Sequence, residues 1–410
     1  MAVETSGRRK MTYIAVASLV FLAVGYVTVL RATKAFKQTD LTCYLVAAQS
    51  VLRGGADLYS VTNERGWHYN YPPLFAIVMV PLAMLPLFWA SLTWYVISVG
   101  LLAWTVSMCV GMVGKDPPQR NEWSLYALPV CVMAWPLISA LTRGQASVLL
   151  MWLVVATFFY GRGGRSALGG LCLAGAIVLK VFPVLLLAYF LWGRAWRLVA
   201  ATLVGLALGA YVLPGAVLGW QNNLARLHEW AALVAKPAVN ASAAETRGQR
   251  YQELLDPTKS RNQSLPAVLV RLTGSARARE VAVGIALVML AVTGLAGGGF
   301  HPRSDLPTVG GIIAWLLLAP PVSETHYFVL LILPLTVLVW VATQQPAGSA
   351  RVAARIALVV FATSNLGKPV EYCGPMLWGT LAVWAALVMA ARRGGMGGVS
   401  GAAVPAAATP

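Results

Sequence analysis

Long apolar runs recur along the whole sequence, separated by short polar segments. A helix needs about 20 apolar residues to cross a bilayer, and about a dozen segments approach that length. Hydrophobic residues make up 58% of the 410 residues and charged residues 11%, whereas soluble domains carry roughly 25% charged residues. The backbone must satisfy its own hydrogen bonds in lipid. We therefore predict an all-α, polytopic transmembrane protein of about 11–13 helices.

Basic residues account for the formal net charge of +17 and gather in short clusters between apolar runs. The clusters are Arg8–Lys10, Arg162 with Arg165, Arg194 with Arg197, Arg351 with Arg355, and Arg392 with Arg393. Lys and Arg are enriched in cytoplasmic loops of membrane proteins, so these clusters predict inner loops and do not call for nucleic acid. The first apolar run, residues 11–30, is predicted to be a retained anchor whose N-terminus stays inside.

The polar segments divide what we predict to be one membrane domain, residues 1–393. A first outer loop is expected at 31–72, with an amphipathic interfacial helix near 41–52, because apolar residues recur there at helical spacing. A second long outer loop is expected at 219–280, beginning with another amphipathic segment. The last residues, 394–410, are rich in Gly, Ala and Pro and are expected to be disordered.

The order of the apolar runs leaves one question of topology open. If the arginine clusters at 162–165 and 194–197 both face inside, Lys180 lies at an outward turn. The chain before the cluster at 162–165 then needs an even number of spans, but the apolar runs offer five. One run between residues 73 and 160 must therefore be re-entrant or merge with its neighbour.

Most of the unusual polar residues fall on the predicted outer face. They include Asp40, Asp57, Lys180, Arg271, Glu324 and His326. A carboxylate within hydrogen-bond reach can take the proton of an attacking hydroxyl, and Lys, Arg and His⁺ can stabilise charge on a departing phosphate. The five cysteines show no metal-ligand spacing. This set suits transfer from a lipid-phosphate donor.

Several short motifs occur in a fixed order from residue 40 to about 330. They are Asp40-Leu41-x-x-Tyr44, Gly55-x-Asp57-Leu58-Tyr59, Tyr69-x-Tyr71-Pro72-Pro73-Leu74, Gly144-Gln145, Lys180-x-x-Pro183, Asn262-Gln263-Ser264-Leu265 with Arg271, and His326-Tyr327. In this order they resemble glycosyltransferase family 87. Its members are GT-C-type polyprenol-phosphate-mannose-dependent α-mannosyltransferases.

The resemblance implies a GT-C fold and an inverting hexose transfer, without metal or cofactor. The donor would be a polyprenyl-phosphate-linked sugar, with mannose expected, and the acceptor a glycolipid or glycan outside the cytoplasm. Asp40 would be the general base, and His326, Lys180 and Arg271 would bind the donor phosphate. The residues expected to bind substrate are Tyr44, Asp57, Tyr69, Tyr71, Gln145, Asn262, Gln263 and Ser264.

Several of these residues also have a structural interpretation. Asp40 could cap the helix that follows it, and Asp57 lies in a Gly-rich turn where Asp is common. Lys180 could extend to the membrane interface, and Tyr69 and Tyr71 could be interfacial aromatics. The chain as a whole could instead be a transporter or lipid flippase, although it shows no sequence repeat of the transporter kind.

Overall fold

The computed structural model describes residues 2–34, 39–114, 123–235, 256–275, 277–298, 305–364 and 368–392. Regular structure in these ranges is helical, and their β pairing is limited to two isolated bridges, Thr62 with His68 and Asn262 with Glu324. The expected all-α class is confirmed. The expected tail at 394–410 and residues 236–255 of the second polar loop lie outside the described ranges.

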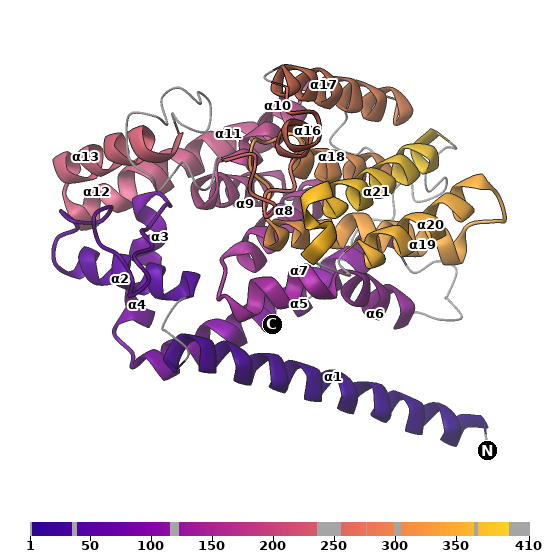
Figure 1. Cartoon of the computed structure of the whole chain (residues 1–410), viewed down its shortest axis with the longest axis horizontal. Helices are drawn as coiled ribbons and strands as arrows, with labels where there is room; N and C mark the ends of the chain where they lie inside the picture. The colour runs from indigo at the N-terminus through magenta and orange to yellow at the C-terminus, as the bar shows by residue number, and fades with distance from the viewer. Residues whose placement is uncertain are drawn as a thin grey trace.

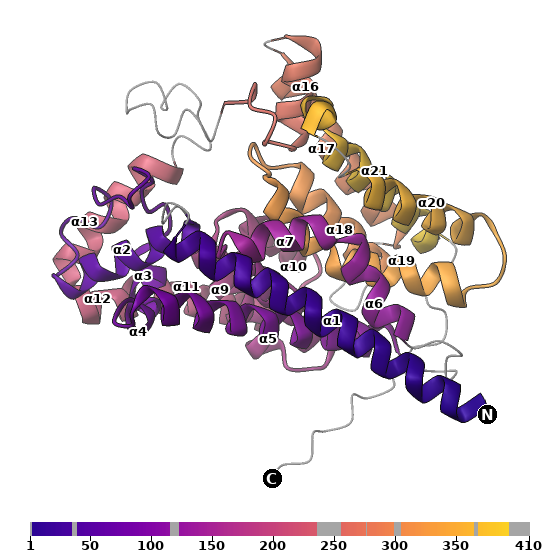
Figure 2. The same ribbon diagram turned by 60° about the horizontal axis from the view of Figure 1, so that its bottom comes forward.

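A long first helix borders the molecule. Helix α1 (Ala2–Thr33) crosses the front of Figure 2 and packs against α5 (Leu87–Val113) and α7 (Ala134–Thr142). The predicted amphipathic helix is present as α2 (Asp40–Leu52). It packs against α3 (Pro73–Val78) and α4 (Val80–Ala83).

The centre of the molecule consists of apolar helices from both halves of the chain. Helix α8 (Ser147–Arg162) packs against α9 (Ser166–Leu179) and against the 3₁₀ segment η5 (Thr325–Leu331), which continues into α19 (Ile332–Gln344). Every residue of α18 (Leu306–Leu318) is buried. Helices that are apolar on all sides belong in the interior of a bundle, so α18 and α19 form its core.

The remaining helices flank this core on two sides (Figure 1). The first group is η1 (Phe182–Val184), α10 (Leu185–Trp192), α11 (Trp196–Leu206), η2 (Ala207–Val212), α12 (Leu213–Leu218), α13 (Trp220–Trp230) and η3 (Ala231–Ala235). The second is α16 (Leu265–Thr273), α17 (Ala278–Ala296), α20 (Ser349–Thr363), η6 (Lys368–Cys373) and α21 (Pro375–Arg392). In Figure 1, α12 and α13 lie beside α2 and α3, and α19–α21 lie at the opposite end.

Within the described ranges, five helical stretches are long and apolar enough to cross a membrane. They are Leu87–Val113, Trp196–Leu218, Ala278–Ala296, Thr325–Gln344 and Pro375–Arg392. Helices α6 (Trp123–Val132) and α7 form a further pair, bent by 68°. Shorter apolar helices such as α8 and α9 pack between them. The chain is therefore a multi-pass membrane protein.

The topological question of the sequence has a structural counterpart at residues 74–87. This apolar run does not form one spanning helix, because it is divided into the short helices α3 and α4. Pro73, Pro81 and Pro86 occupy the helix starts here, where proline is tolerated but cannot continue a preceding helix. Without this run, four apolar stretches precede the arginine cluster at 162–165, an even number: α1, α5, the bent α6–α7 pair and α8.

Candidate active site

Asp40 begins helix α2 but does not cap it. Thr39 is the N-cap, and its hydroxyl accepts a hydrogen bond from the N–H of Thr42, while the Thr42 hydroxyl accepts one from the N–H of Thr39. This reciprocal arrangement is a capping box. The Asp40 carboxylate is therefore not needed to satisfy the helix end.

The Asp40 carboxylate instead pairs with Arg143. Arg143 Nε donates to Asp40 Oδ2 at 3.0 Å, and the backbone N–H of Asp40 donates to the Arg143 carbonyl, also at 3.0 Å. The side chain of Asp40 is 19% exposed and that of Arg143 is 27% exposed, so the pair is mostly buried but still accessible. Among the described residues, no hydrogen bond is donated to the second carboxylate oxygen, Oδ1.

A tight turn after α7 brings Arg143 to Asp40. Gly144 has a φ of +62°, and a Cβ built on it would lie 2.7 Å from the Cβ of Leu41. The indole N–H of Trp94 donates to the Gly144 carbonyl at 3.0 Å and fixes the turn from the other side. Glycine is needed here both for the left-handed backbone and for the close approach to α2.

Lys180 reaches the same region from the end of α9. Its backbone is extended, with φ −146° and ψ 133°, so the helix stops there. The ammonium nitrogen lies 3.6 Å from the ring centroid of Tyr327 and 5.7 Å from that of Tyr71. Burial lowers the pKa of the Lys180 ammonium, and the nearby carboxylates of Glu324 and Asp40 partly oppose this shift. The aromatic faces therefore attract and help to hold the ammonium group.

Glu324 and His326 enter from the loop before α19. Glu324 is the N-cap residue of η5, and its Oε2 lies 3.4 Å from Nδ1 of His326. Burial raises the pKa of the Glu324 carboxyl, while the charges of Arg143 and Lys180 act to lower it. The His326 ring is 1% exposed and packs edge-on against Tyr327, with ring centroids 4.7 Å apart.

Five ionisable side chains from four separate segments therefore form one polar cluster: Asp40, Arg143, Lys180, Glu324 and His326. Glu324 is within electrostatic range of Arg143, Asp40 and Lys180, and His326 of Lys180 and Arg143. We call this set the charged cluster. Two carboxylates and two cations balance each other there, and the imidazole lies beside them.

Arg143 and Glu324 were not among the predicted site residues. Arg143 directly precedes the Gly144-Gln145 motif, and Glu324 lies two residues before His326 on the predicted outer face. The signal in the sequence that could have identified them was their position next to these motifs. Because the topology between residues 73 and 160 was open, the sequence did not decide on which face of the membrane Arg143 lies.

Three of the predicted substrate-binding residues lie together beside Asp40. The Tyr44 hydroxyl is 3.0 Å from the Tyr71 hydroxyl and donates to Gln145 Oε1 at 3.2 Å. Both tyrosines are within electrostatic range of Asp40. Tyr69 is more peripheral, because its hydroxyl donates to the Pro72 carbonyl at 2.8 Å.

The segment 262–264 contacts the loop that carries Glu324. Asn262 Nδ2 donates to the Pro321 carbonyl at 2.8 Å, and its Oδ1 accepts from the Ser323 N–H at 3.0 Å. The Gln263 N–H donates to the Ser323 carbonyl at 2.8 Å. The Ser264 hydroxyl donates to Pro321 and caps α16. Asn262 and Ser264 hold the backbone of the loop through their side chains, and Gln263 does so through its N–H. The Gln263 side chain bonds to Ser260, Glu371 and Met376 instead.

Arg271 was expected to bind the donor phosphate, but it is bound to backbone carbonyls. Its guanidinium donates to four backbone carbonyls, those of Pro257, Lys259, Asn262 and Tyr372. It is 7% exposed, and burial lowers its pKa. An arginine committed to backbone carbonyls stabilises the turn before α16, and the structure does not bring it into the charged cluster.

Asp57 also serves local structure. It accepts hydrogen bonds from the Ser50 hydroxyl and from Arg53 Nη2, the latter at 3.0 Å. Hydrogen bonds from Ser50 and Arg53 lower its pKa, against a smaller opposing effect of burial. Its place in the turn after α2 agrees with ordinary turn chemistry.

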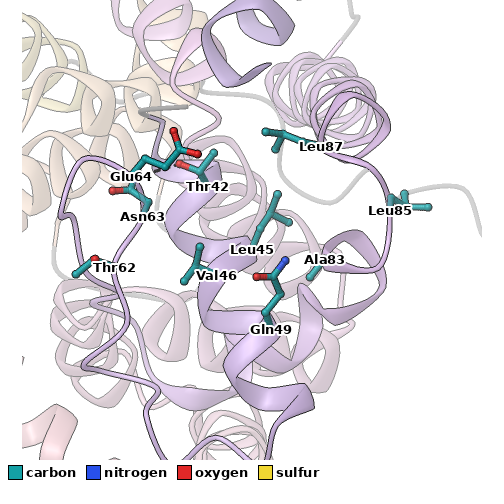
Figure 3. Close-up of a pocket in the computed structure, with 10 residues that line it drawn as sticks. All are labelled: Thr42, Leu45, Val46, Gln49, Thr62, Asn63, Glu64, Ala83, Leu85 and Leu87. Atoms are coloured by element: carbon teal, nitrogen blue, oxygen red, sulfur yellow. Dashed lines mark hydrogen bonds between the residues drawn. The ribbon is translucent and has the colours of Figure 1, made fainter. Parts of the chain in front are cut away.

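A separate cavity of about 300 Å³ lies beside α2 (Figure 3). Its α2 wall consists of Thr42, Leu45, Val46 and Gln49, which share one helix face. Asp40 and Tyr44 lie on the opposite face by the same helical spacing. The cavity is therefore distinct from the charged cluster.

Comparison with known proteins shows to which family the chain is similar. The model of glycosyltransferase family 87 matches residues 69–317, more than half of the chain. Asp40 and His326 lie outside the matched residues. A crystal structure of ArnT from Cupriavidus metallidurans bound to undecaprenyl phosphate aligns with a TM-score of 0.37 and 14% identity, over 92% of this chain and 77% of that one.

Curated relatives come from mycobacteria. A polyprenol-phosphate-mannose-dependent alpha-(1-2)-phosphatidylinositol mannoside mannosyltransferase of Mycobacterium tuberculosis is 28% identical over 75% of this chain and 71% of its own length. The corresponding pentamannoside enzyme of Mycolicibacterium smegmatis is 26% identical over 83% and 78%. Of the two classes that the sequence left open, the comparisons select the enzyme. The chain is a membrane glycosyltransferase and belongs to glycosyltransferase family 87.

Proposed function

We propose that this protein transfers mannose from a polyprenyl-phosphate donor to a hydroxyl of a glycolipid or glycan, with inversion at the sugar's C1 and Asp40 as general base. The observation that carries the proposal is the charged cluster, which places one carboxylate with an open oxygen beside two cations and an imidazole. The names of the mycobacterial relatives supply the donor class.

The reaction needs two kinds of group within reach of one sugar. The acceptor oxygen forms a bond to C1, the C1–O bond to phosphate breaks, and its electron pair leaves with the phosphate. Asp40 Oδ1 takes the proton of the acceptor hydroxyl, which makes the oxygen a better nucleophile. Arg143 holds Oδ2 and so orients the carboxylate.

The departing phosphate requires positive charge. Lys180 and Arg143 provide fixed cations near Asp40, and His326 provides a donor when it is protonated. Preorganised cations in a water-poor site stabilise the developing charge more than they would in water. The pair of hydroxyls from Tyr44 and Tyr71, with Gln145, supplies hydrogen-bonding groups for a sugar next to the base.

We further propose that the cluster faces outside the cytoplasm. With α1 running outward and residues 74–87 not crossing, α5, the α6–α7 pair, α8, α9 and α10 alternate across the membrane. This order places Arg143 and Lys180 outside and the arginines at 162–165 and 194–197 inside, as the positive-inside rule favours. Continuing through α11–α12, α17 and α18 brings Glu324 and His326 to the outer side as well.

The test uses membranes that contain the full chain, incubated with radiolabelled polyprenyl-phosphate-mannose and lipid extract. We expect labelled glycolipid or glycan whose new linkage is inverted relative to the donor. Polyprenyl-phosphate-arabinose and polyprenyl-phosphate-glucose serve as comparison donors. Transfer from one of those alone would change the assigned sugar. Absence of transfer from all three would overturn the proposed function.

A further inference from the structure

The charged cluster contains a second carboxylate that the reaction above does not use. Glu324 Oε2 lies 3.4 Å from His326 Nδ1, at ion-pair distance but longer than a normal hydrogen bond. His326 Nδ1 is buried and has no hydrogen-bond partner among the described residues. A buried ring nitrogen without a partner is costly, so its placement next to a carboxylate calls for a reason.

The position of Glu324 is fixed by its backbone on both sides. Asn262 and Glu324 form an isolated antiparallel bridge, and Ser323 is held by Asn262 and Gln263. On the other side, the N–H of Tyr327 donates to the Glu324 carbonyl at 2.8 Å and starts η5. The same short segment therefore fixes Glu324 and His326 relative to each other, two residues apart.

The chemistry of imidazole explains what such a carboxylate can do. A neutral ring has one N–H, whereas a phosphate oxygen needs an N–H from the nitrogen that faces it. A carboxylate on Nδ1 orients the ring and favours the form in which both nitrogens carry protons. Burial, and after it the neighbouring charges of Lys180 and Arg143, act in the opposite direction on His326. Glu324 is the carboxylate in ion-pair contact with the ring that can offset them.

We propose that Glu324 is a positioning residue for sugar transfer, whose carboxylate accepts the Nδ1–H of His326 and so presents Nε2–H to the phosphate of the lipid-linked donor. This inference rests on the proposed function, because it assigns His326 to the donor phosphate. Outer partners of this kind are worth roughly 10-fold to 100-fold in affinity or activity in metal-bound histidines, and we expect a loss of about that size here.

A double-mutant cycle tests whether Glu324 acts through His326. Glu324→Gln, His326→Ala and the double variant are purified and assayed for kcat and KM with polyprenyl-phosphate-mannose. We expect Glu324→Gln to lose about 10-fold to 100-fold in kcat/KM and the double variant to lose no more than His326→Ala alone. Glu324→Asp keeps the charge and should recover part of the loss. Losses that multiply in the double variant would overturn the proposal.

A spectroscopic measurement separates this inference from the proposed function. The chain has 4 histidines, so ¹⁵N-histidine labelling gives few ring signals, and His326→Ala assigns one of them. Adding undecaprenyl phosphate should shift that signal to the doubly protonated form in the wild type and not in Glu324→Gln. Glu280→Gln, an exposed residue of α17, is the matched control and should behave like the wild type.

The outcomes are distinguishable. If the wild type transfers no sugar but the ring signal still responds to undecaprenyl phosphate through Glu324, the proposed function fails and the pairing stands. If transfer occurs but Glu324→Gln keeps full activity and an unchanged ring signal, the inference about Glu324 is wrong and the proposed function stands.

Discussion

The charged cluster has two halves that are built in different ways. The half around Asp40 is held by its own helix start, where Thr39 and Thr42 form a capping box within four residues. The half around Glu324 and His326 is held from a distance, by Asn262 and Gln263 about 60 residues earlier in the chain. Local chemistry fixes the helix start that carries Asp40, the proposed base, whereas long-range hydrogen bonds fix the segment of Glu324 and His326, which are proposed to act at the phosphate.

This difference has a consequence for the effects of mutations. A change at a helix cap disturbs the few residues of that helix end. A change in a buried network that holds a loop leaves several polar groups unsatisfied at once. The Asp40 half should therefore tolerate changes in its scaffold better than the Glu324 half does.

Removing the group that joins the two halves should have the largest effect among the scaffold changes. Arg143 pairs with Asp40 and is within electrostatic range of Glu324. Arg143→Ala should reduce kcat on the order of 10²-fold to 10³-fold, by analogy with loss of one preorganised charge-stabilising group. The control is Arg53→Ala, which removes an exposed ion pair with Asp57 and should leave kcat within about twofold.

Removing hydrogen bonds that hold the Glu324 half should have the second-largest effect. Asn262→Ala removes three hydrogen bonds, to Pro321, Ser323 and Ser264. It should cost about 3 kcal/mol of stability and on the order of 10-fold to 100-fold in kcat, because a small displacement of the reacting groups is enough. Thermal unfolding in detergent and the transfer assay measure the two effects. Asn222→Ala, which loses an exposed bond to the Gly54 carbonyl, should change neither strongly.

The lysine between the halves predicts a pH dependence. Burial lowers the pKa of Lys180, so its ammonium loses its proton at a lower pH than the roughly 10.4 of a free lysine. Since the phosphate needs the charged form, kcat/KM for the donor should fall as pH rises through that lowered pKa. Lys180→Arg keeps its charge at all these pH values and should abolish this descending limb. A limb that is unchanged in Lys180→Arg would assign the titration to another group.

The cap of the Asp40 half should have the smallest effect. Thr39→Ala removes the N-cap of α2 and should cost about 1 kcal/mol of stability. The Asp40 backbone would still be tied to Arg143 by its own N–H, so kcat should fall by less than about fivefold. A loss in Thr39→Ala that equals the loss in Asn262→Ala would contradict the contrast between the two halves.

The same contrast explains which features of the fold and the site could be predicted from the sequence. The amphipathic helix at 41–52 and the break at Lys180-Pro183 follow from spacing and proline, which act locally, and both are present. Arg143 was missed because its place depends on which apolar run crosses the membrane. Arg271 was expected at the phosphate because the sequence cannot show that three carbonyls of the turn before α16 and the distant carbonyl of Tyr372 surround its guanidinium.

The central claim is that Asp40 takes the proton while the rest of the cluster binds the donor. Asp40→Asn tests it most directly, because the amide keeps the shape but cannot act as a base. Binding of undecaprenyl phosphate and single-turnover transfer are measured on the same purified protein. We predict binding within about threefold of the wild type and transfer reduced at least about 10²-fold. Transfer at the wild-type rate in Asp40→Asn would contradict the account.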